Sequence, residues 1–187
     1  LHRAAQLLGS FKQLAVDQTS SQRRRFDLHE LMQEIALTMR PAIRRTAHQL
    51  HCTIPPQLEL ESYPGPLGQV LMNLIANALT HAFAAGVAGN IWVQAWLCDG
   101  DCVRLVVSDD GCGIPDGQQK RVFDPFFTTK LGQGGSGLGL HIVYTLVTGL
   151  LGGRIALESY CGQGSRFTLE LPLCAPMPSA GTAQDAP

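Results

Sequence analysis

Alternation of hydrophobic and polar positions predicts a β-hairpin in the middle of the chain. Apolar residues recur at every second position across residues 90–98 and again across 102–109. Between the two runs lies Asp-Gly-Asp, a combination that is typical of tight turns. Shorter alternations of the same kind predict strands at 26–28, 50–54, 57–61, 154–159 and 165–171.

A period of three to four residues predicts the helices. The strongest run, residues 63–83, carries apolar side chains along one full face. A second run spans 29–47 and contains Pro41, which predicts a kink or an early end, and a third begins near Leu140. Residues 1–22 carry a short seam of coiled-coil type; the alternative is a helix that lies against its own domain.

The order of elements is strand, helix, two strands, helix, hairpin, loop, helix and hairpin. Strands and helices do not alternate strictly, so we expect an α+β fold in two layers, a mixed sheet covered on one face by about three helices. The domain should span about 23–174, with a glycine-rich lid at 115–136 as its most mobile internal segment. The Pro/Ala/Ser/Gly-rich chain after Pro172, and 175–187 above all, is expected to be disordered.

Asp109 is the first candidate for chemistry. It is the last residue of the second hairpin strand and lies on the same face as the apolar side chains of that strand. A buried carboxylate without a partner lowers stability, so we expect it to bind a ligand. An ionised carboxylate only accepts hydrogen bonds, which suits the exocyclic amine of adenine and disfavours the carbonyl of guanine. Gly111 and Gly113, which follow, would let the backbone approach a flat ring.

A polar ridge borders the apolar stripe of the strongest helix. Gln69, Asn73, Asn77 and His81 follow one another at steps of four, which places them on one side of a helix. Asn is a mediocre helix former, so two on one ridge need a reason. Amide oxygens are hard ligands that suit Mg²⁺. The alternative is that both amides only tie adjacent backbone together.

A second glycine cluster precedes the third helix. Gly135, Gly137 and Gly139 alternate with other residues immediately before the apolar run. Unpaired N–H groups at a helix start, approached closely where no side chain intervenes, form an anion site that suits phosphates. One such cluster alone indicates only a turn. Two clusters on either side of a loop, after an acidic strand end, indicate a nucleotide pocket.

Composition narrows the class of protein. The chain has 187 residues, 45% of them hydrophobic and 16% charged, as in soluble globular domains. A net charge of -1 argues against nucleic-acid binding. The longest apolar run is too short and too polar to cross a bilayer. Six cysteines without a Cys-x-x-Cys pair indicate reduced thiols of a cytoplasmic domain, not a metal site or disulfides.

Together with a phenylalanine motif at Phe123, Phe126 and Phe127, these three motifs resemble, in the same order, the conserved boxes of sensor histidine kinases. The resemblance spans about 25–172, and residues 1–22 resemble the end of the dimerisation and phosphotransfer hairpin that precedes the ATP-binding domain. Related ATPases share the first two boxes, whereas the last two favour the kinase branch. The boxes are Asn73-x-x-x-Asn77, Asp109-x-Gly111-x-Gly113, Phe123-x-x-Phe126-Phe127 and Gly135-x-Gly137-x-Gly139-Leu140, followed by the turn Gly162-x-Gly164-Ser165-x-Phe167.

The resemblance implies a Bergerat-type fold with ATP and Mg²⁺ as cofactors. Asp109 would bind the adenine amine, Asn77 would bind Mg²⁺, and Asn73 would lie near the phosphates. Lys130 could neutralise charge on the transferred phosphate; the alternative is an ordinary solvated lysine. The other implied contacts come from the Phe box and second glycine box, namely Phe126 and Phe127 as anchors of the lid, Thr128, Gly135, Ser136, Gly137, Leu138, Gly139 and Leu140.

Two departures from the family pattern matter. The basic residue that often stands three after the second Asn is replaced by Thr80, and His81 could supply that contact unless it is only a half-buried, hydrogen-bonded histidine. No histidine fits the acceptor pattern His-[Glu/Asp]-x-x-[Thr/Asn]-Pro, since His29-Glu30 lacks the rest of it. The chain starts at Leu1 without Met, so we expect a piece of a longer protein whose acceptor histidine lies upstream.

The sequence therefore predicts the catalytic domain of a protein histidine kinase. The full protein would be a homodimer that moves the γ-phosphoryl of ATP to its own histidine, signals to a response regulator, and meets a membrane only through upstream segments. This chain alone should bind nucleotide without autophosphorylating. The alternatives are an ATPase whose lid closure drives a conformational cycle, and a non-catalytic nucleotide-binding module.

Overall fold

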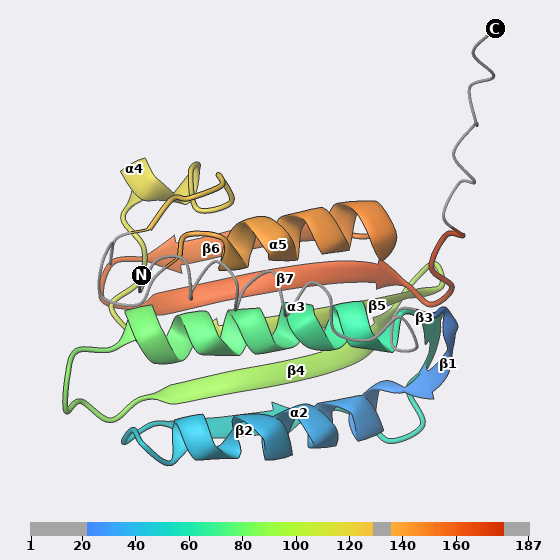
Figure 1. Ribbon diagram of the computed structural model, residues 1–187, viewed down its shortest axis with the longest axis horizontal. Helices are drawn as coiled ribbons and strands as arrows, with labels where there is room; N and C mark the ends of the chain where they lie inside the picture. The colour runs from blue at the N-terminus through green and yellow to red at the C-terminus, as the bar shows by residue number, and fades with distance from the viewer. Residues whose placement is uncertain (1–21, 129–135, 178–187) are drawn as a thin grey trace, which may run out of the picture.

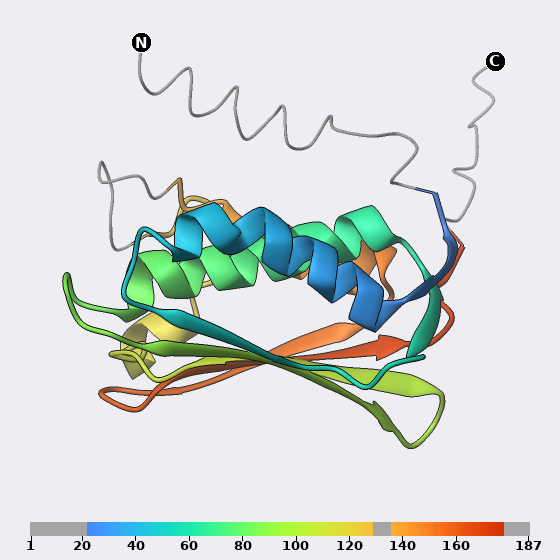
Figure 2. The ribbon, with the colours of Figure 1, turned by 90° about the horizontal axis from the view of Figure 1, so that it is seen from below.

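The computed structural model describes residues 22–128 and 136–177. Figure 1 shows two layers, a sheet and the helices α2 (Leu28–Ile43), α3 (Pro64–Asn77) and α5 (Gly139–Thr145), which lie over one of its faces. In Figure 2 the sheet is seen nearly edge-on, with blue α2 and green α3 on the same side of it. The expected two-layer α+β architecture is thereby confirmed. The helix expected for residues 1–22 lies almost wholly outside the described residues.

The main sheet has five strands in the order β2-β4-β5-β7-β6. Strand β2 (Gln49–Thr53) runs parallel to β4 (Asn90–Cys98). The remaining neighbours, β5 (Cys102–Asp109), β7 (Gly164–Pro172) and β6 (Arg154–Tyr160), pair antiparallel. The sheet is therefore mixed, as expected, and both strands of the predicted hairpin begin and end at the predicted residues.

A second, two-stranded sheet pairs β1 (Arg24–Asp27) with β3 (Glu59–Ser62). The chain after β7 continues onto this sheet, where the N–H of Ala175 donates to the carbonyl of Glu61 at 2.9 Å. Ala175 is only 2% exposed. The expectation of disorder from Pro172 onward is therefore wrong for residues 172–176, because the edge of β3 offers these residues backbone partners and an apolar surface.

Helix α2 (Leu28–Ile43) begins at Asp27, whose side chain accepts from the N–H of His29 at 2.7 Å. It ends two residues after Pro41, so the expected early end is confirmed. Helix α3 (Pro64–Asn77) begins with a proline, which suits a first helical turn because the missing N–H would have no partner there. None of the described helices is long and apolar enough to cross a membrane.

The core lies between α3 and the inner face of the sheet. Helix α3 buries almost the whole apolar stripe that the sequence predicts, and the alternate residues of β4, β5 and β7 meet it. The fully buried members of this interface include Leu67, Val70, Leu71, Ile75, Ile91, Val93, Val103, Leu105 and Leu169. Burial of this size is the main favourable contribution to folding, and it fixes α3 over the end of β5.

Two helices continue as π-helices. Residues Ala78–Ala82 form η1 after α3, and Leu146–Leu150 form η2 after α5 (Gly139–Thr145). The period of the sequence did not predict either segment. A π turn adds a residue to the helical repeat, so His81 no longer follows Asn77 at the spacing of one straight ridge. A short helix, α4 (Asp116–Gln119), lies in the segment that the sequence assigns to the lid.

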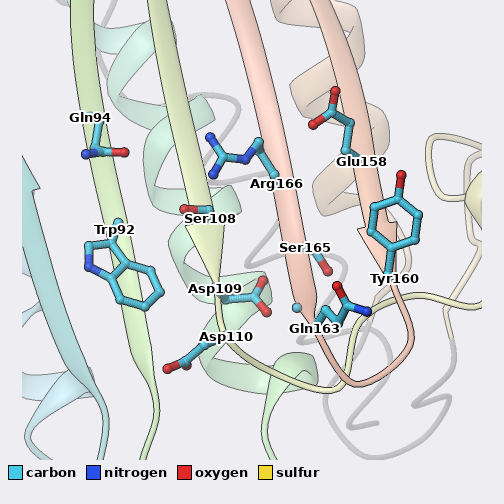
Figure 3. Close-up of a pocket in the computed structure, with 11 residues that line it drawn as sticks. Trp92, Gln94, Ser108, Asp109, Asp110, Glu158, Tyr160, Gln163, Ser165 and Arg166 are labelled. Atoms are coloured by element: carbon cyan, nitrogen blue, oxygen red, sulfur yellow. The ribbon is translucent and has the colours of Figure 1, made fainter.

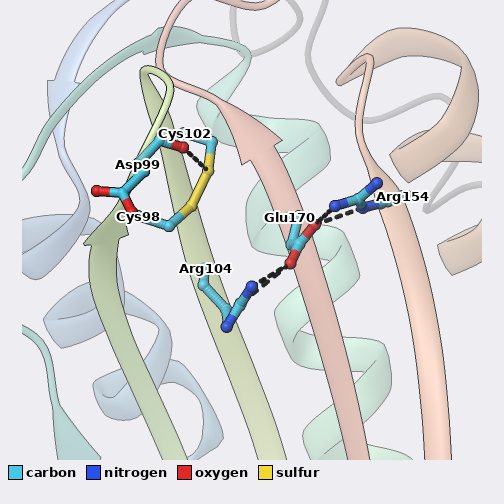
Figure 4. A network of polar contacts seen from close by, with 6 residues as sticks. All are labelled: Cys98, Asp99, Cys102, Arg104, Arg154 and Glu170. Atoms are coloured by element: carbon cyan, nitrogen blue, oxygen red, sulfur yellow. Dashed lines mark hydrogen bonds and ion pairs between the residues drawn. A yellow bond between two sulfur atoms is a disulfide. The ribbon is translucent and has the colours of Figure 1, made fainter.

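Cys98 and Cys102 form a disulfide across the β4–β5 hairpin (Figure 4). The expectation of reduced thiols is wrong for this pair. The two residues lie directly opposite each other in the strand register, with their Cα atoms 5.4 Å apart, a separation that a disulfide spans readily. Metal-ligand spacing does not indicate this pair, whereas the register of the predicted hairpin does. The four other cysteines are free.

Candidate functional site

A cavity of about 610 Å³ lies where α3 and η1 meet the end of β5, the start of β7 and the start of α5. Residues from all four sequence motifs line it, although the motifs are spread over the chain. The predicted site residues that line the cavity are Asn73, Asn77, His81, Asp109, Gly113, Phe127, Thr128, Ser136, Gly137, Gly139 and Leu140. Gly111, Phe126 and Leu138 do not line it, and Lys130 and Gly135 lie outside the described residues.

Asp109 points into this cavity from the end of β5. It is 9% exposed, on the same face as the buried side chains of its strand, as the alternation predicts. One carboxylate oxygen accepts from the N–H of Gly111 at 3.0 Å, and the backbone N–H of Ser165 donates to the carboxylate as well. Burial raises the pKa of Asp109, the two N–H donors lower it in part, and the charge of Asp110 raises it further.

The neighbouring carboxylate has a different role. Both oxygens of Asp110 accept from Asn90, from its N–H at 2.7 Å and from its side-chain amide at 2.8 Å. Burial acts to raise the pKa of Asp110, but these hydrogen bonds outweigh it and the pKa is lowered. Asp110 therefore fixes the start of β4, whereas Asp109 has no ion pair within the described part of the chain and keeps acceptor capacity for a ligand.

Asn73 and Asn77 face the cavity with buried amide groups. The side-chain nitrogens of both are buried and have no hydrogen-bond partner among the described residues. A buried donor without a partner costs about 1–3 kcal/mol, so the pair calls for a ligand. The alternative, that these amides only tie adjacent backbone together, does not hold for the two nitrogens. A β-carbon at Gly139 would lie 3.7 Å and 3.8 Å from the two amide oxygens, so the second glycine cluster adjoins this pair.

Three of the motif glycines make room for the protein's own backbone. A β-carbon at Gly111 would lie 2.2 Å from the carbonyl oxygen of Ala82, and one at Gly113 would lie 2.1 Å from that of Tyr160. One at Gly137 would lie 2.5 Å from the backbone of Phe126. Their missing side chains therefore let separate segments pack against one another around the cavity. Gly111 does not line the cavity, so the expected approach to a flat ring is wrong for Gly111. Gly113 lines the cavity with a φ of 70°, and its approach to a flat ring stays a prediction.

The chain that leaves β5 is fastened to the β6–β7 turn, which Figure 3 shows beside it. The carbonyl of Cys112 accepts from the N–H of Gly162 at 2.8 Å, and the N–H of Ile114 donates to the hydroxyl of Ser159 at 2.7 Å. The side chain of Gln119 donates to the carbonyl of Ser159 at 2.8 Å. The first residues of the segment assigned to the lid are thus held in place by the sheet.

A shallower cavity of about 430 Å³ opens on the other face of the sheet (Figure 3). Trp92, Arg166 and Tyr160 line it, and Asp109 and Ser165 border both cavities. These two residues therefore separate the two cavities at the end of β5.

The phenylalanines of the third motif divide their roles differently from the expectation. Phe126 is 66% exposed, with a backbone φ of 65°, so its side chain does not anchor the lid. Phe123 does so instead: its ring lies 5.5 Å from that of Tyr144 and 6.4 Å from that of Phe167. Phe127 lines the cavity, and the guanidinium carbon of Arg121 lies over the Phe127 ring, 5.0 Å from the ring centre.

Sequence reasoning missed the contribution of β7 and of two cysteines. Ser165 and Phe167 line the cavity from β7, and Cys112 and Cys161 line it from the two fastened loops. Alternation along β7 was the available signal, since it places Ser165 and Phe167 on the inner face with the buried leucines of that strand. The glycines around Cys161 indicate only a turn and give no signal for its place at the cavity.

A family model for histidine kinase-, DNA gyrase B- and HSP90-like ATPases matches residues 63–175, more than half of the chain. The chain therefore belongs to this family. Within the family, it is a catalytic ATP-binding domain of the sensor histidine kinase type.

Relatives and solved structures agree on this branch. The chain is 34% identical to the sensor histidine kinase RcsC of Salmonella typhimurium over 169 residues, 87% of this chain and 17% of that protein. It is 36% identical to AruS of Pseudomonas aeruginosa over 166 residues, 84% of this chain and 16% of that protein. It thus spans less than a fifth of these relatives.

The catalytic domain of the histidine kinase ThkA superposes with a TM-score of 0.72 at 30% identity, covering 82% of this chain and 97% of that one. Full-length ShkA, solved in complex with AMPPNP, gives a TM-score of 0.69 at 28% identity over 82% of this chain and 32% of that one.

Proposed function

We propose that this domain binds MgATP in the 610 Å³ cavity and presents its γ-phosphoryl group to a histidine outside this chain. One observation carries the proposal: among the described residues, a buried carboxylate without an ion pair and two buried amide nitrogens without partners share one cavity. A hydrophobic pocket that served only the fold would not retain two unsatisfied amide nitrogens beside a buried carboxylate.

The adenine end of the cavity is assigned to Asp109. Its carboxylate is fixed by the N–H groups of Gly111 and Ser165, so it is oriented before a ligand arrives. A carboxylate in this position accepts a hydrogen bond from an exocyclic amine and repels a carbonyl oxygen. The site should therefore select adenine over guanine, because guanine would leave the buried carboxylate facing another acceptor.

The phosphate end is assigned to Asn73 and Asn77. Each side chain offers one oxygen that can bind a hard cation and one buried N–H group that can donate to phosphate. These groups fit Mg²⁺, which keeps waters and shares the phosphate oxygens with few protein ligands. When bound, Mg²⁺ supplies neutralisation of phosphate charge. ShkA was solved in complex with AMPPNP, which supports nucleotide binding by this fold.

The remaining residues position the nucleotide. Ser136, Gly137 and Gly139 bring the start of α5 to the cavity, where unpaired N–H groups can donate to phosphate oxygens. His81 and Thr128 border the same space. Lys130 remains assigned to the transferred phosphate. Positioning and charge neutralisation supply most of the catalysis of phosphoryl transfer, so no general base is required of this domain.

The partners of the full protein follow from the same proposal. We assign the acceptor histidine to a dimerisation and phosphotransfer hairpin upstream of this chain, and the next acceptor to a response regulator. The full protein would then be a homodimer whose kinase domains lie on the cytoplasmic side of any membrane. The names of the relatives as sensor histidine kinases support this assignment.

Calorimetry with ADP or AMPPNP, with and without Mg²⁺, tests the proposal directly. We expect micromolar affinity that is about 100-fold weaker in Asp109→Ala, since a buried hydrogen bond to a charged group is worth about 2–3 kcal/mol. Asp110→Asn is the matched control, because the adjacent carboxylate is occupied by Asn90; its affinity should stay within about threefold. A folded protein without affinity for adenine nucleotides would refute the proposal.

The family description also names DNA gyrase B- and HSP90-like ATPases, so the second candidate function is an ATPase whose lid closure drives a conformational cycle. This second function predicts steady phosphate release without any acceptor protein, lost in Asn77→Ala. The kinase proposal predicts instead an acid-labile phosphohistidine once an upstream helix pair with its histidine is supplied in cis. Measuring both products on the same preparation separates the two functions.

A further inference from the structure

Two of the four free cysteines line the cavity proposed for the nucleotide. Cys112 lies between the two glycines that follow Asp109, and Cys161 lies in the β6–β7 turn. Both are exposed, as are the other two free cysteines, Cys52 and Cys174, which line neither of the two cavities. The nucleotide site therefore carries a pair of accessible thiols that neither adenine recognition nor phosphate binding uses.

A backbone hydrogen bond joins the two segments that carry these thiols. The N–H of Gly162, the residue after Cys161, donates to the carbonyl of Cys112 at 2.8 Å, so the two segments run side by side. Gly162 thus lies opposite Cys112, and Cys161 is the adjacent residue of the same turn. Both cysteines line the same cavity.

Neither thiol is committed to a strong interaction in the described residues. The sulfur of Cys112 lies 3.6 Å from the carbonyl oxygen of His81 and 3.5 Å from that of Gly113, which are weak contacts for a thiol. The disulfide between Cys98 and Cys102 lies at the opposite end of β5, so it does not compete for either sulfur. The thiols are thus accessible to an oxidant through the open mouth of the cavity.

We propose that Cys112 and Cys161 form a reversible disulfide that closes the adenine end of the cavity, so that nucleotide binding depends on the redox state. The inference rests on the proposed function of this cavity. The segment that carries Cys112 cannot move aside, because Gly111 packs on Ala82 and Gly113 packs on Tyr160. A sulfur bridge between the two loops therefore occupies space beside Asp109, and the fixed backbone has no other place for the purine.

The chemistry balances with a peroxide as oxidant. The thiolate of one cysteine attacks the O–O bond of hydrogen peroxide, which gives a sulfenic acid and, after proton uptake, one water. The second thiol then attacks that sulfur: the S–S bond forms, the S–O bond breaks, and a second water leaves. The two sulfurs lose two electrons to the peroxide. A dithiol reductant reverses the step by thiol–disulfide exchange.

Trypsin places the free cysteines on different peptides, so a disulfide between Cys112 and Cys161 can be detected by mass spectrometry. Cys112 lies on peptide 105–120 and Cys161 on peptide 155–166, whereas Cys52 and Cys174 lie on two others. After one equivalent of hydrogen peroxide, we expect mass spectrometry of the chain to find 105–120 joined to 155–166. ADP present during oxidation should slow the formation of this link and leave alkylation of Cys52 unchanged.

Calorimetry with ADP then compares the oxidised and reduced forms of each variant, so each variant serves as its own reference. Oxidation should weaken ADP binding at least tenfold in the unmodified chain, and dithiothreitol should restore it. Cys161→Ser should abolish both the peptide link and the difference in ADP affinity between the oxidised and reduced forms. The matched control Cys174→Ser should retain both. The ratio of the ADP dissociation constants of the oxidised and reduced forms is insensitive to any general effect of a substitution on the cavity.

Two results would overturn the inference, and a third separates it from the proposed function. Peptides 105–120 and 155–166 that stay unlinked after oxidation refute the disulfide. A linked protein that binds ADP as tightly as the reduced one refutes the closure of the cavity. Reduced protein that fails to bind ADP refutes the proposed function itself, and the redox dependence of binding with it.

Discussion

Two carboxylates on opposite faces of one sheet show how differently the same group can be used. Asp109, at the end of β5, points toward the helices, where burial raises its pKa. Glu170, on the neighbouring strand β7, points to the open face between Arg104 and Arg154 (Figure 4). It accepts from the guanidinium Nε of Arg104 at 3.1 Å, and both arginines hold the pKa of Glu170 below its ordinary value.

The difference separates a functional charge from a structural one. Glu170 has its partners within the protein and exchanges water for them at a surface, where ion pairs contribute little. Asp109 is buried with no ion pair among residues 22–128 and 136–177, and two N–H groups satisfy it only in part. Such a group lowers stability unless a ligand completes its hydrogen bonds. Each prediction below tests one side of this contrast.

The largest effect is expected where the backbone of Asp109 is held. Gly164 has a φ of 84°, and a β-carbon there would lie 1.9 Å from the carbonyl oxygen of Asp109. Gly164→Ala therefore requires the β5 end and the β6–β7 turn to separate, at a cost of more than about 3 kcal/mol. Chemical denaturation measures this cost.

Gly100→Ala is the matched control for Gly164→Ala. Gly100 has nearly the same φ, 83°, but no heavy atom lies within 4 Å of a β-carbon placed there. The control should lose only the cost of the left-handed conformation, about 1 kcal/mol. Equal losses in the two variants would show that the close packing on Asp109 contributes nothing, and the contrast between the two carboxylates would lose its structural basis.

The next largest effect is expected for Asp109→Asn, which should lower nucleotide affinity without lowering stability. Because burial raises the pKa of Asp109, the folded chain binds this proton more tightly than the unfolded chain. Stability contributed by the protonated form is therefore lost as pH rises from the ordinary value of 3.8 through the raised pKa. Asp109→Asn removes that loss. At pH 7 it should unfold at the same or a higher temperature, yet bind ADP about 100-fold more weakly.

Thermal unfolding across pH 4 to 8 checks the sign of this effect. The unmodified chain should lose stability relative to Asp109→Asn as pH increases, and the gap should close toward acid. A variant that is less stable than the unmodified chain at pH 7 would mean that the buried carboxylate has a partner that stabilises its charge.

A smaller effect is expected at the amide pair. Asn77→Ala removes one candidate ligand while Mg²⁺ keeps its waters and the phosphates, so ADP affinity should fall about tenfold in Mg²⁺ and less in its absence. Gln69→Ala is the control, since Gln69 precedes the Asn pair on the same helix and does not line the cavity. An equal loss with and without Mg²⁺ would assign Asn77 to the phosphates alone.

Local periodicity accounts for what the sequence predicts about this site. Alternation along β5 placed Asp109 inward, and steps of four placed Asn73 and Asn77 together, because both periods follow directly from backbone geometry. The exposure of Phe126 and the role of Gly111 depend on which distant segment packs against them. The disulfide between Cys98 and Cys102 required the hairpin register to be considered. Contacts between segments far apart in the sequence are not encoded in any local period.

The smallest effect is expected on the open face of the sheet. Glu170 has a pKa lowered from the ordinary 4.5 by Arg104 and Arg154, so its contribution to stability is present above that pH and is lost as pH falls through the lowered pKa. Glu170→Gln should lower the melting temperature at pH 7 by at most about 3 °C, since surface ion pairs are weak. The difference should shrink in high salt, where screening is strong, and disappear in acid.

ADP affinity should not change, because Glu170 lines neither cavity. A loss as large as that of Gly164→Ala, or a weaker nucleotide affinity, would mean that the open face also supports the site and that the two carboxylates are not independent.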